Sequence, residues 1–232
     1  MSSLTKDKFF KDVASHELVI LRDDGVYRHL RFTRPNTRCM QFDLITWPGY
    51  LCYTGDMGTF VFQRLNDMLV FFRPSERNNE DPFKWIDFRY WHEKLESIDK
   101  GGEKEFDPDA FRREITKQRR RILVEHGRDI DPNQRRELWD DLGDLKDKAE
   151  DGEERAMAAA YDWSFDLNRS ISHQRRLSIG LDVDDFPDCK CWTHRFEWCC
   201  FALRWGVMAY DKAKQAQADA ASQILIGKTG VV

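Results

Sequence analysis

The stretch that decides the fold is residues 42–62, which read FDLITWPGYLCYTGDMGTFVF. Large apolar residues recur in it with the short-period alternation that is typical of β-strands. Pro48-Gly49 and Gly55-Asp56-Met57-Gly58 divide the stretch, and these are the residue types that tight turns require. Connections this short leave no room for a crossover, so the strands on either side of each turn must be antiparallel.

The same pattern continues in both directions. Upstream, Leu18–Leu21 and Val26–Phe32 read as the two arms of a hairpin around the turn Asp23-Asp24-Gly25. Downstream, apolar residues from Leu65 to Phe72 follow the helical period, and Pro74 ends this helix. The sequence therefore predicts an antiparallel meander of about five strands with a helix packed on one face.

The last strong element is a helix from Trp192 to Tyr210. Apolar residues cover much of its circumference, which indicates a helix in the centre of a core. We expect it to pack against the segment 42–72 in a single core. The predicted fold class is α+β, an antiparallel β-meander packed against a C-terminal core helix, with a charged helical insertion.

The insertion is the polar middle of the chain. Asp107-Pro108 and Asp131-Pro132 are strong helix starts, with an N-cap aspartate followed by proline in the first turn. A third, alanine-rich helical run spans Gly152 to Trp163, whereas Asp166 to Asp188 reads as irregular. We predict a sheet with a helix over 1–75 that is completed by a core helix at 189–215, a charged helical insertion at 83–165, and an exposed extension at 216–232.

Composition excludes several classes of protein. The 232 residues are 41% hydrophobic, 13% aromatic and 34% charged, with a formal net charge of -4. No global basic field draws the chain to nucleic acid or anionic lipid. No apolar run is long enough to span a bilayer, and the polar N-terminus lacks the apolar region of a secretory signal. We therefore expect cytoplasmic localisation and free thiols at the 6 cysteines.

Few residues suggest a metal site. Cys189, Cys191 and His194, together with Cys199 and Cys200, offer enough ligands for zinc, but their spacing matches zinc sites poorly. Neighbours on a helix point about 100° apart, so Cys199 and Cys200 cannot both face one metal ion. We interpret this adjacent pair as small buried apolar residues. A metal site and a transient Cys189–Cys191 disulfide remain alternatives, and no cofactor or metal is predicted.

An enzyme is one of three functional hypotheses. The chain has no phosphate-binding glycine loop, nucleophile elbow or metalloprotease motif. Asp43 lies in an otherwise apolar strand, and a buried acid can be catalytic. An enzyme with an unfamiliar site around His29, Asp43 and Asp56 is thus a possible function. Because no known catalytic motif supports it, it is the weakest of the three hypotheses, and no catalytic residue is predicted.

Charged residues of the insertion suggest binding instead. Arg112, Arg119 and Arg120 can align along one helix face and follow a phosphate backbone. The simpler interpretation is a solvated face whose arginines pair with interleaved acids. Acidic residues dominate the following stretch and can occupy a basic groove on a partner. The candidate partner-binding residues are Arg112, Arg119, Arg120, Asp140, Asp141, Asp144, Asp147 and Glu150.

Two blocks carry a resemblance to a family of uncharacterised phage and prophage proteins. One is FDLITWPGYLCYTGDMGTFVF at 42–62, and the other is HRFEWCCFALRWG at 194–206. The resemblance implies a phage origin and expression inside an infected bacterial cell, but it carries no catalytic or binding residues. Phage accessory proteins of this size commonly bind a host or phage protein, and inhibition of a defence complex such as a CRISPR effector is one case.

Three functions therefore stay open from the sequence. The first is a non-enzymatic phage accessory protein that binds a macromolecular partner, such as a host defence nucleoprotein complex. The second is a nucleic-acid-associated phage protein that uses the arginine-rich helical face. The third is the unfamiliar enzyme.

Overall fold

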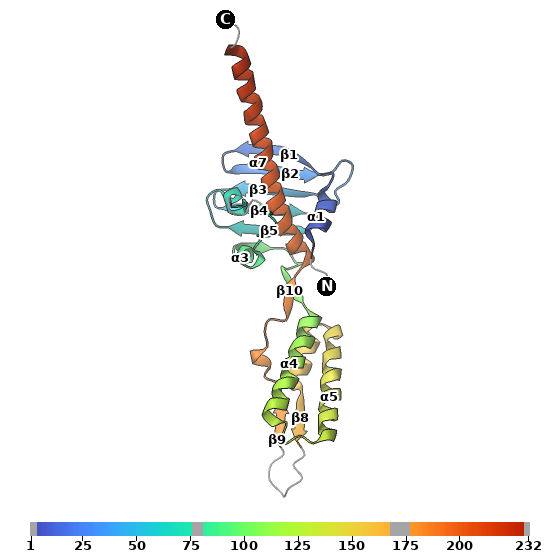
Figure 1. The fold of residues 1–232 in the computed structure, drawn as a ribbon. Coiled ribbons are helices and arrows are strands. Elements are labelled where there is room, and N and C mark those ends of the chain that lie inside the picture. The colour runs from blue at the N-terminus through green and yellow to red at the C-terminus, as the bar shows by residue number, and fades with distance from the viewer. Residues whose placement is uncertain (1–3, 76–80, 168–176, 230–232) are drawn as a thin grey trace. The chain divides into compact units, whose positions relative to one another are not determined.

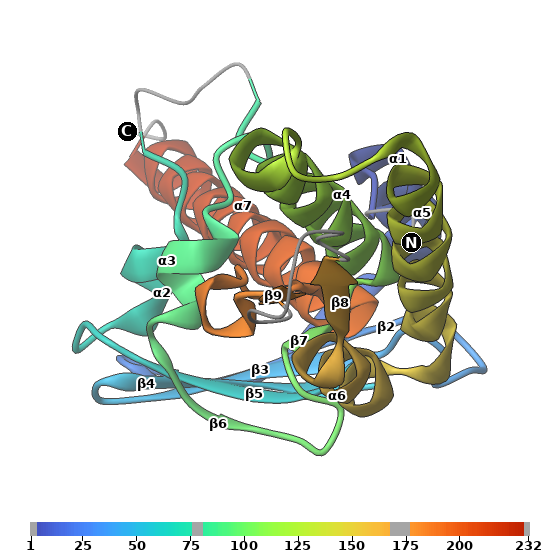
Figure 2. The same cartoon turned by 90° about the horizontal axis from the view of Figure 1, so that it is seen from below.

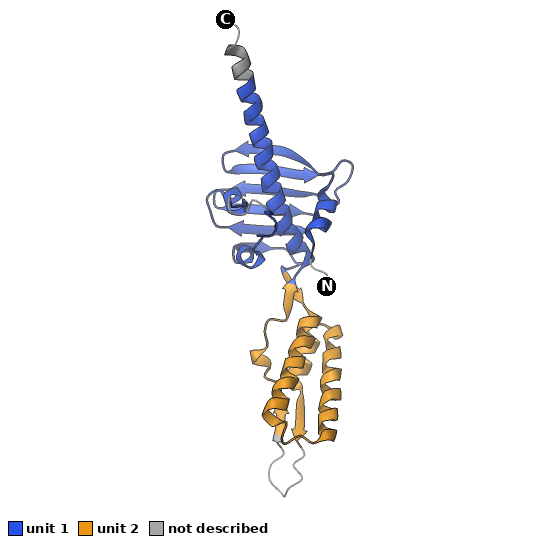
Figure 3. Ribbon diagram, in the orientation of Figure 1, with its two compact units in different colours: residues 1–103, 192–232 blue, residues 104–191 orange. Residues whose placement is uncertain are grey.

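A computed structural model describes residues 4–75, 81–167 and 177–229. The chain forms two compact units, one of residues 1–103 with 192–232 and the other of residues 104–191 (Figure 3). The second unit corresponds to the predicted insertion at 83–165 but has different limits. Residues 83–103 belong to the sheet unit, and residues 166–191 belong to the second unit.

The first unit contains a six-stranded antiparallel sheet in which the strands follow one another in chain order. This arrangement confirms the predicted α+β class and the meander. The turns at Pro48-Gly49 and Asp56-Met57 lie between β3 and β4 and between β4 and β5 as predicted. The strands are β1 (Glu17–Asp24), β2 (Tyr27–Thr33), β3 (Phe42–Trp47), β4 (Tyr50–Gly55), β5 (Gly58–Gln63) and β6 (Leu95–Ile98).

The sixth strand was not expected. Residues 83–95 read as helical, yet only α3 (Phe88–His92) is a helix there, and the chain then enters β6. The predicted helix over 65–72 is also shorter, because Asp67 caps α2 (Met68–Phe72) by accepting a hydrogen bond from the backbone N–H of Leu69. The helix α1 (Lys6–Val13), which buries Phe9 and Val13, was missed.

One face of the sheet carries the core of the first unit. Cross-strand rows such as Leu30, Leu44, Tyr53 and Phe60 are fully buried on this face. Helix α7 (His194–Thr229) runs across the strands (Figure 1), and α2 and α3 lie on the same side of the sheet (Figure 2). The expected packing of 42–72 against 192–210 in one core is therefore confirmed.

Helix α7 approaches the sheet closely at Gly206. A Cβ atom added there would lie 2.9 Å from Leu44 Cδ1 and 3.2 Å from the Phe32 ring, so only glycine fits without a shift of the neighbours. The predicted core helix at 189–215 differs from α7 at both ends. Helix α7 starts later, at His194, and it extends further, to Thr229. Residues 216–223, the described side chains of the predicted extension, are exposed as expected.

The second unit has its own core. Helices α4 (Pro108–His126) and α5 (Pro132–Asp147) start at the two predicted caps, and Asp131 and Gln134 form a capping box. Phe111 and Ile115 on α4 share this core with Leu138 and Leu142 on α5. The two helices that these caps predicted are thus present and pack against each other. The other elements are η2 (Lys148–Asp151), α6 (Glu153–Asp162), β8 (Ser164–Leu167), β9 (Leu177–Gly180) and η3 (Val183–Asp185).

Two short strands lie where the chain enters and leaves the second unit. They are β7 (Lys104–Phe106) and β10 (Lys190–Trp192), which pair with each other. The region 166–188 was predicted to be irregular, but part of it is regular. In that part β9 pairs with β8 in an antiparallel hairpin.

Candidate partner-binding surface

Helices α4 and α5 form a hollow with a basic and apolar lining. Its volume is about 310 Å³, and it is lined by Arg119, Leu123, Arg135, Leu138 and Trp139. Arg119 and Leu123 lie one helical turn apart on α4, which places them on the same face. The side chain of Arg135 donates a hydrogen bond of 2.7 Å to the carbonyl of Gly127, which fixes it beside the α4–α5 connection.

A second hollow on the same helices is acidic. Its volume is about 480 Å³. Asp140, Asp144 and Asp147 lie on successive turns of α5, so their carboxylates gather on one side of it. Arg112 and Lys146 are its two cations. The residues that line it are Arg112, Trp139, Asp140, Gly143, Asp144, Lys146 and Asp147.

Trp139 lines both hollows and is 57% exposed. The guanidinium carbon of Arg119 lies 3.5 Å from the centre of the Trp139 ring, a close cation–π contact. Burial, with the neighbouring charge of Arg120, lowers the pKa of Arg119. The indole therefore contacts Arg119 while more than half of its surface stays exposed to solvent. We call the residues of the two hollows together the Trp139 surface.

The carboxylates of the acidic hollow lack cationic partners. Within the described residues, no ion pair or hydrogen bond engages the carboxylates of Asp140, Asp144 and Asp147, and all three are exposed. Arg112, in contrast, donates to Asp109 Oδ1 at 2.9 Å and also pairs with Glu150. The hollow therefore keeps a net negative charge.

The structure brings five of the eight predicted partner-binding residues to this surface. Arg112, Asp140, Asp144 and Asp147 line the acidic hollow, and Arg119 lines the basic one. Glu150 joins them through its pair with Arg112. Arg120 and Asp141 are exposed but line neither hollow. The predicted arginine stripe is not continuous, because Arg112 is engaged by two carboxylates and Arg119 by an indole.

Trp139 itself was not predicted. The helical spacing of the sequence could have identified it. Leu138, Leu142 and Leu145 form the buried face of α5, and a tryptophan next to Leu138 must point away from that face. A large aromatic residue on the charged face of a helix is the kind of residue that protein interfaces use.

Of the three residues in the enzyme hypothesis, His29 and Asp43 are in contact and Asp56 is not. His29 Nε2 lies 2.7 Å from Asp43 Oδ2, and Arg31 donates two hydrogen bonds, of 2.9 and 2.8 Å, to the same carboxylate. Burial raises the pKa of Asp43, but the hydrogen bonds from Arg31 and His29 outweigh it and lower the pKa. Asp56 lies elsewhere, where it accepts a hydrogen bond from the backbone N–H of Met40. A carboxylate that is held ionised by the Arg31 guanidinium is a poor general base.

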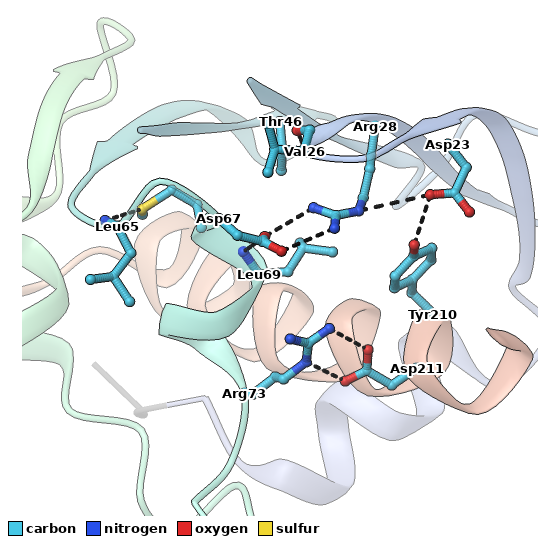
Figure 4. A network of polar contacts seen from close by, with 11 residues as sticks. Asp23, Val26, Arg28, Thr46, Leu65, Asp67, Leu69, Arg73, Tyr210 and Asp211 are labelled. Carbon is cyan, nitrogen blue, oxygen red and sulfur yellow. Dashed lines mark hydrogen bonds and ion pairs between the residues drawn. The ribbon is translucent and has the colours of Figure 1, made fainter. Parts of the chain in front are cut away.

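A second polar network in the first unit links the sheet to two helices (Figure 4). Arg28 on β2 donates to both carboxylate oxygens of Asp67, at 2.9 and 3.0 Å, and its Nε lies 3.8 Å from Asp23. Tyr210 on α7 donates to Asp23 at 2.8 Å, while Arg73 pairs with Asp211. These contacts join β1, β2, α2 and α7, so the network has a structural role.

The cysteines behave as buried apolar residues where the sequence suggested it. Cys199 and Cys200 are fully buried, and burial raises the pKa of each thiol well above its usual value. The described structure has no disulfide bond between any of the 6 cysteines. Among the residues with described positions, no group of three His, Cys, Asp or Glu side chains has the geometry to hold a metal ion. Likewise, no helix in the described ranges is both long and apolar enough to cross a membrane.

Comparisons with family models, curated proteins and solved structures found no match. The function therefore has to be argued from the surface itself.

Proposed function

We propose that the protein is a non-enzymatic binding protein whose Trp139 surface receives a protein partner. The observation that carries this proposal is an exposed tryptophan that contacts Arg119 and lies between two hollows of opposite charge. Tryptophan and arginine are the residues that most often dominate the binding energy of protein interfaces. An indole that already contacts Arg119 loses less side-chain entropy on binding than an indole without such a contact.

The placement of the carboxylates supports the same function. Asp140 and Asp144 are spaced i,i+4, and like charges at this spacing destabilise a helix by about 0.2–0.5 kcal/mol. Asp144 and Asp147 lie in the last turn of α5, where the helix dipole favours cations. These residues therefore lower the stability of α5. Local rules of stability are broken most often at functional sites.

The charge of this region suggests what the partner presents. Between Glu137 and Glu154 the chain has nine acidic side chains and two lysines. Such a surface is complementary to a basic groove of the kind that proteins use to bind nucleic acid. Within this proposal, the partner is a bacterial nucleic-acid-binding complex, and a CRISPR effector is one example of that class. The phage origin implied by the resemblance is part of the proposal.

The test is competitive capture. Immobilised protein is incubated with purified nucleic-acid-binding effector complexes, and the bound fraction is measured with and without competing double-stranded DNA. Wild-type protein should retain a complex, and DNA should displace it, because both ligands occupy the basic groove. Trp139→Ala should weaken binding by at least about thirtyfold, which corresponds to the about 2 kcal/mol of an interface hot spot.

Tyr161→Ala is the matched control. Tyr161 lies in the same unit, is 73% exposed and lines neither hollow, so its removal should leave binding unchanged. Equal loss of binding in both variants would reject the Trp139 surface as the contact. Retention that DNA does not displace would reject the basic groove as the target.

A further inference from the structure

No described helix of the first unit packs on the face of the sheet opposite α7, since α1, α2, α3 and α7 all pack on the core side (Figure 2). The open face of an antiparallel sheet normally carries polar side chains. Here Val19 and Leu21 are exposed, and Ile45 and Val61 are only half-buried.

An aromatic row crosses this face. In the β2–β3 register Arg28 pairs with Thr46, which brings Tyr27 and Trp47 opposite each other, and Trp47 in turn pairs with Tyr50 on β4. The Trp47 and Tyr50 rings are stacked, with centroids 5.3 Å apart and planes at 15°. Tyr27 is 43% exposed. Gln63 on β5 donates to the Tyr50 hydroxyl at 2.8 Å and so extends the row by one strand.

Cationic side chains accompany the row. The guanidinium carbon of Arg22 lies 5.0 Å from the centre of the Tyr27 ring. A hollow of about 270 Å³ lies beside these residues, and Arg22, Tyr27, His29 and Trp47 are among those that line it. Arg31 is on the same face as His29, two residues along β2.

The carboxylates near the row are engaged by these cations. Asp24 pairs with Arg22 at 3.2 Å, and both side chains are exposed, so this pair contributes little and Arg22 can exchange partners. Asp43 accepts hydrogen bonds from Arg31 and His29. In the described contacts each of these carboxylates is therefore paired with an arginine.

We propose that this face binds single-stranded nucleic acid. Successive bases stack on Tyr27, Trp47 and Tyr50, and the phosphates between them lie near Arg22 and Arg31. Stacking on aromatic side chains together with nearby cations is how proteins bind single strands without reading their sequence. A duplex keeps its base faces covered, so it cannot use the row.

A second copy of the chain fits this face less well. Face-to-face packing of two identical sheets would bury the cluster of Arg31, Asp43 and His29 at the interface. Removing these charged groups from water costs more than their mutual attraction returns. A single strand instead leaves the cations in contact with water and phosphate.

The experiment measures fluorescence anisotropy of a labelled oligothymidylate of about 20 nucleotides at about 50 mM salt, with the full chain. Saturable binding is expected. Trp47→Ala should weaken it about tenfold, in line with the loss of one stacked base, whereas Trp47→Phe should retain most of it. Arg22→Gln should weaken it less and should reduce the dependence on salt concentration.

Two control variants separate this site from the proposed function. Trp85 is 55% exposed in the turn before α3, and Trp139 belongs to the second unit. Trp85→Ala and Trp139→Ala should both bind the oligonucleotide like the wild type. Because Trp139→Ala is the variant that should lose the protein partner, either site can fail its test without affecting the other.

Several outcomes would overturn the proposal. They are the absence of saturable binding, equal affinity for a duplex of the same length, and equal affinity of the wild type, Trp47→Ala and Arg22→Gln. Light scattering measures whether the protein is a dimer and so tests a second copy of the chain as the occupant of this face. A wild-type dimer that becomes a monomer in Trp47→Phe or Arg22→Gln would assign the face to a second copy. The folding of each variant is checked by urea unfolding before binding is interpreted.

Discussion

Arg204 on α7 lies against the indole of Trp91 on α3, with its guanidinium carbon 5.3 Å from the centre of the ring. The arginine is only 4% exposed, and its Nε and Nη1 have no hydrogen-bond partner among the described residues. Burial lowers the pKa of Arg204 to about 10. An unpaired guanidinium in a core lowers the stability of the protein, because removing the charge from water is not offset.

Replacing Arg204 should therefore stabilise the first unit. Arg204→Met keeps the length of the side chain and removes the charge, and we expect the free energy of unfolding to rise by about 1–2 kcal/mol. Urea unfolding of the two proteins at one pH measures the difference. Arg73→Met is the matched control: it breaks the pair with Asp211, at 2.7 Å, and should lower the free energy of unfolding by up to about 1 kcal/mol. A loss of stability in Arg204→Met would show that the contact with Trp91 outweighs the cost of burial.

The contact between Arg119 and Trp139 should be measurable on its own. A double-mutant cycle of Arg119→Ala and Trp139→Ala should give a coupling energy of about 0.5–1 kcal/mol, the range for an exposed cation–π pair. Urea unfolding of the four proteins supplies the cycle. A coupling energy of zero would mean that Arg119 does not hold the indole in solution.

Removing charge from the acidic hollow should stabilise α5 and weaken partner binding at the same time. Asp144→Asn and Asp147→Asn each relieve an unfavourable interaction with the end of the helix, and we expect a gain of about 0.3–1 kcal/mol for each. Thermal unfolding measures the gain, and competitive capture measures the loss of binding. Asp166→Asn, an exposed change on β8 away from the hollow, is the control. Stabilised variants that bind with full affinity would argue against a role of these carboxylates in recognition.

The cluster around Asp43 should make stability depend on acid. The folded-state pKa of Asp43 is below its ordinary value of 3.8, so the cluster stabilises the protein above about pH 4, and this contribution is lost as the pH falls through the folded-state pKa. The difference in unfolding free energy between wild type and Asp43→Asn should be largest near neutral pH and should shrink below about pH 4. A difference that does not change with pH would mean that the carboxylate has an ordinary pKa.

The thiols should differ sharply in reactivity. Cys39 is exposed, whereas Cys199 and Cys200 are fully buried with a raised pKa. Because the thiolate is the reactive form, a thiol reagent should modify Cys39 first and should reach Cys199 and Cys200 only after unfolding. Mass spectrometry of the peptides over time follows the order. Rapid labelling of Cys199 in the native protein would contradict the buried position of α7.

The parts of the fold that local chemistry specifies could be predicted from the sequence. Glycine and proline pairs located the turns of the meander, and Asp107 and Asp131 located the starts of α4 and α5. β6 escaped prediction because Leu95–Ile98 has only two apolar residues, and the hydrogen bonds that make it a strand come from the edge of β5. Its conformation is decided by a tertiary contact, which no local pattern records.

The candidate site, like the fold, could be predicted from the sequence only in part. The acidic residues of α5 follow a helical spacing that is visible in the sequence, so their common face could be anticipated. The two hollows could not, because they exist only where side chains of α4 come beside Trp139 of α5. Arg112 supplies the α4 side of the acidic hollow, and Arg119 and Leu123 supply that of the basic one. Side chains from separate helices meet there, and their register depends on the packing of Phe111, Ile115, Leu138 and Leu142.

The order of the elements along the chain has a consequence for biosynthesis. The strands that α7 covers leave the ribosome before the second unit, and α7 leaves only after the whole of the second unit has been made. During that interval Phe32, Phe42 and Leu44 have no partner from α7, and a nascent sheet with such a face is prone to aggregate. We therefore expect the emerging chain to need a chaperone until translation has passed residue 210.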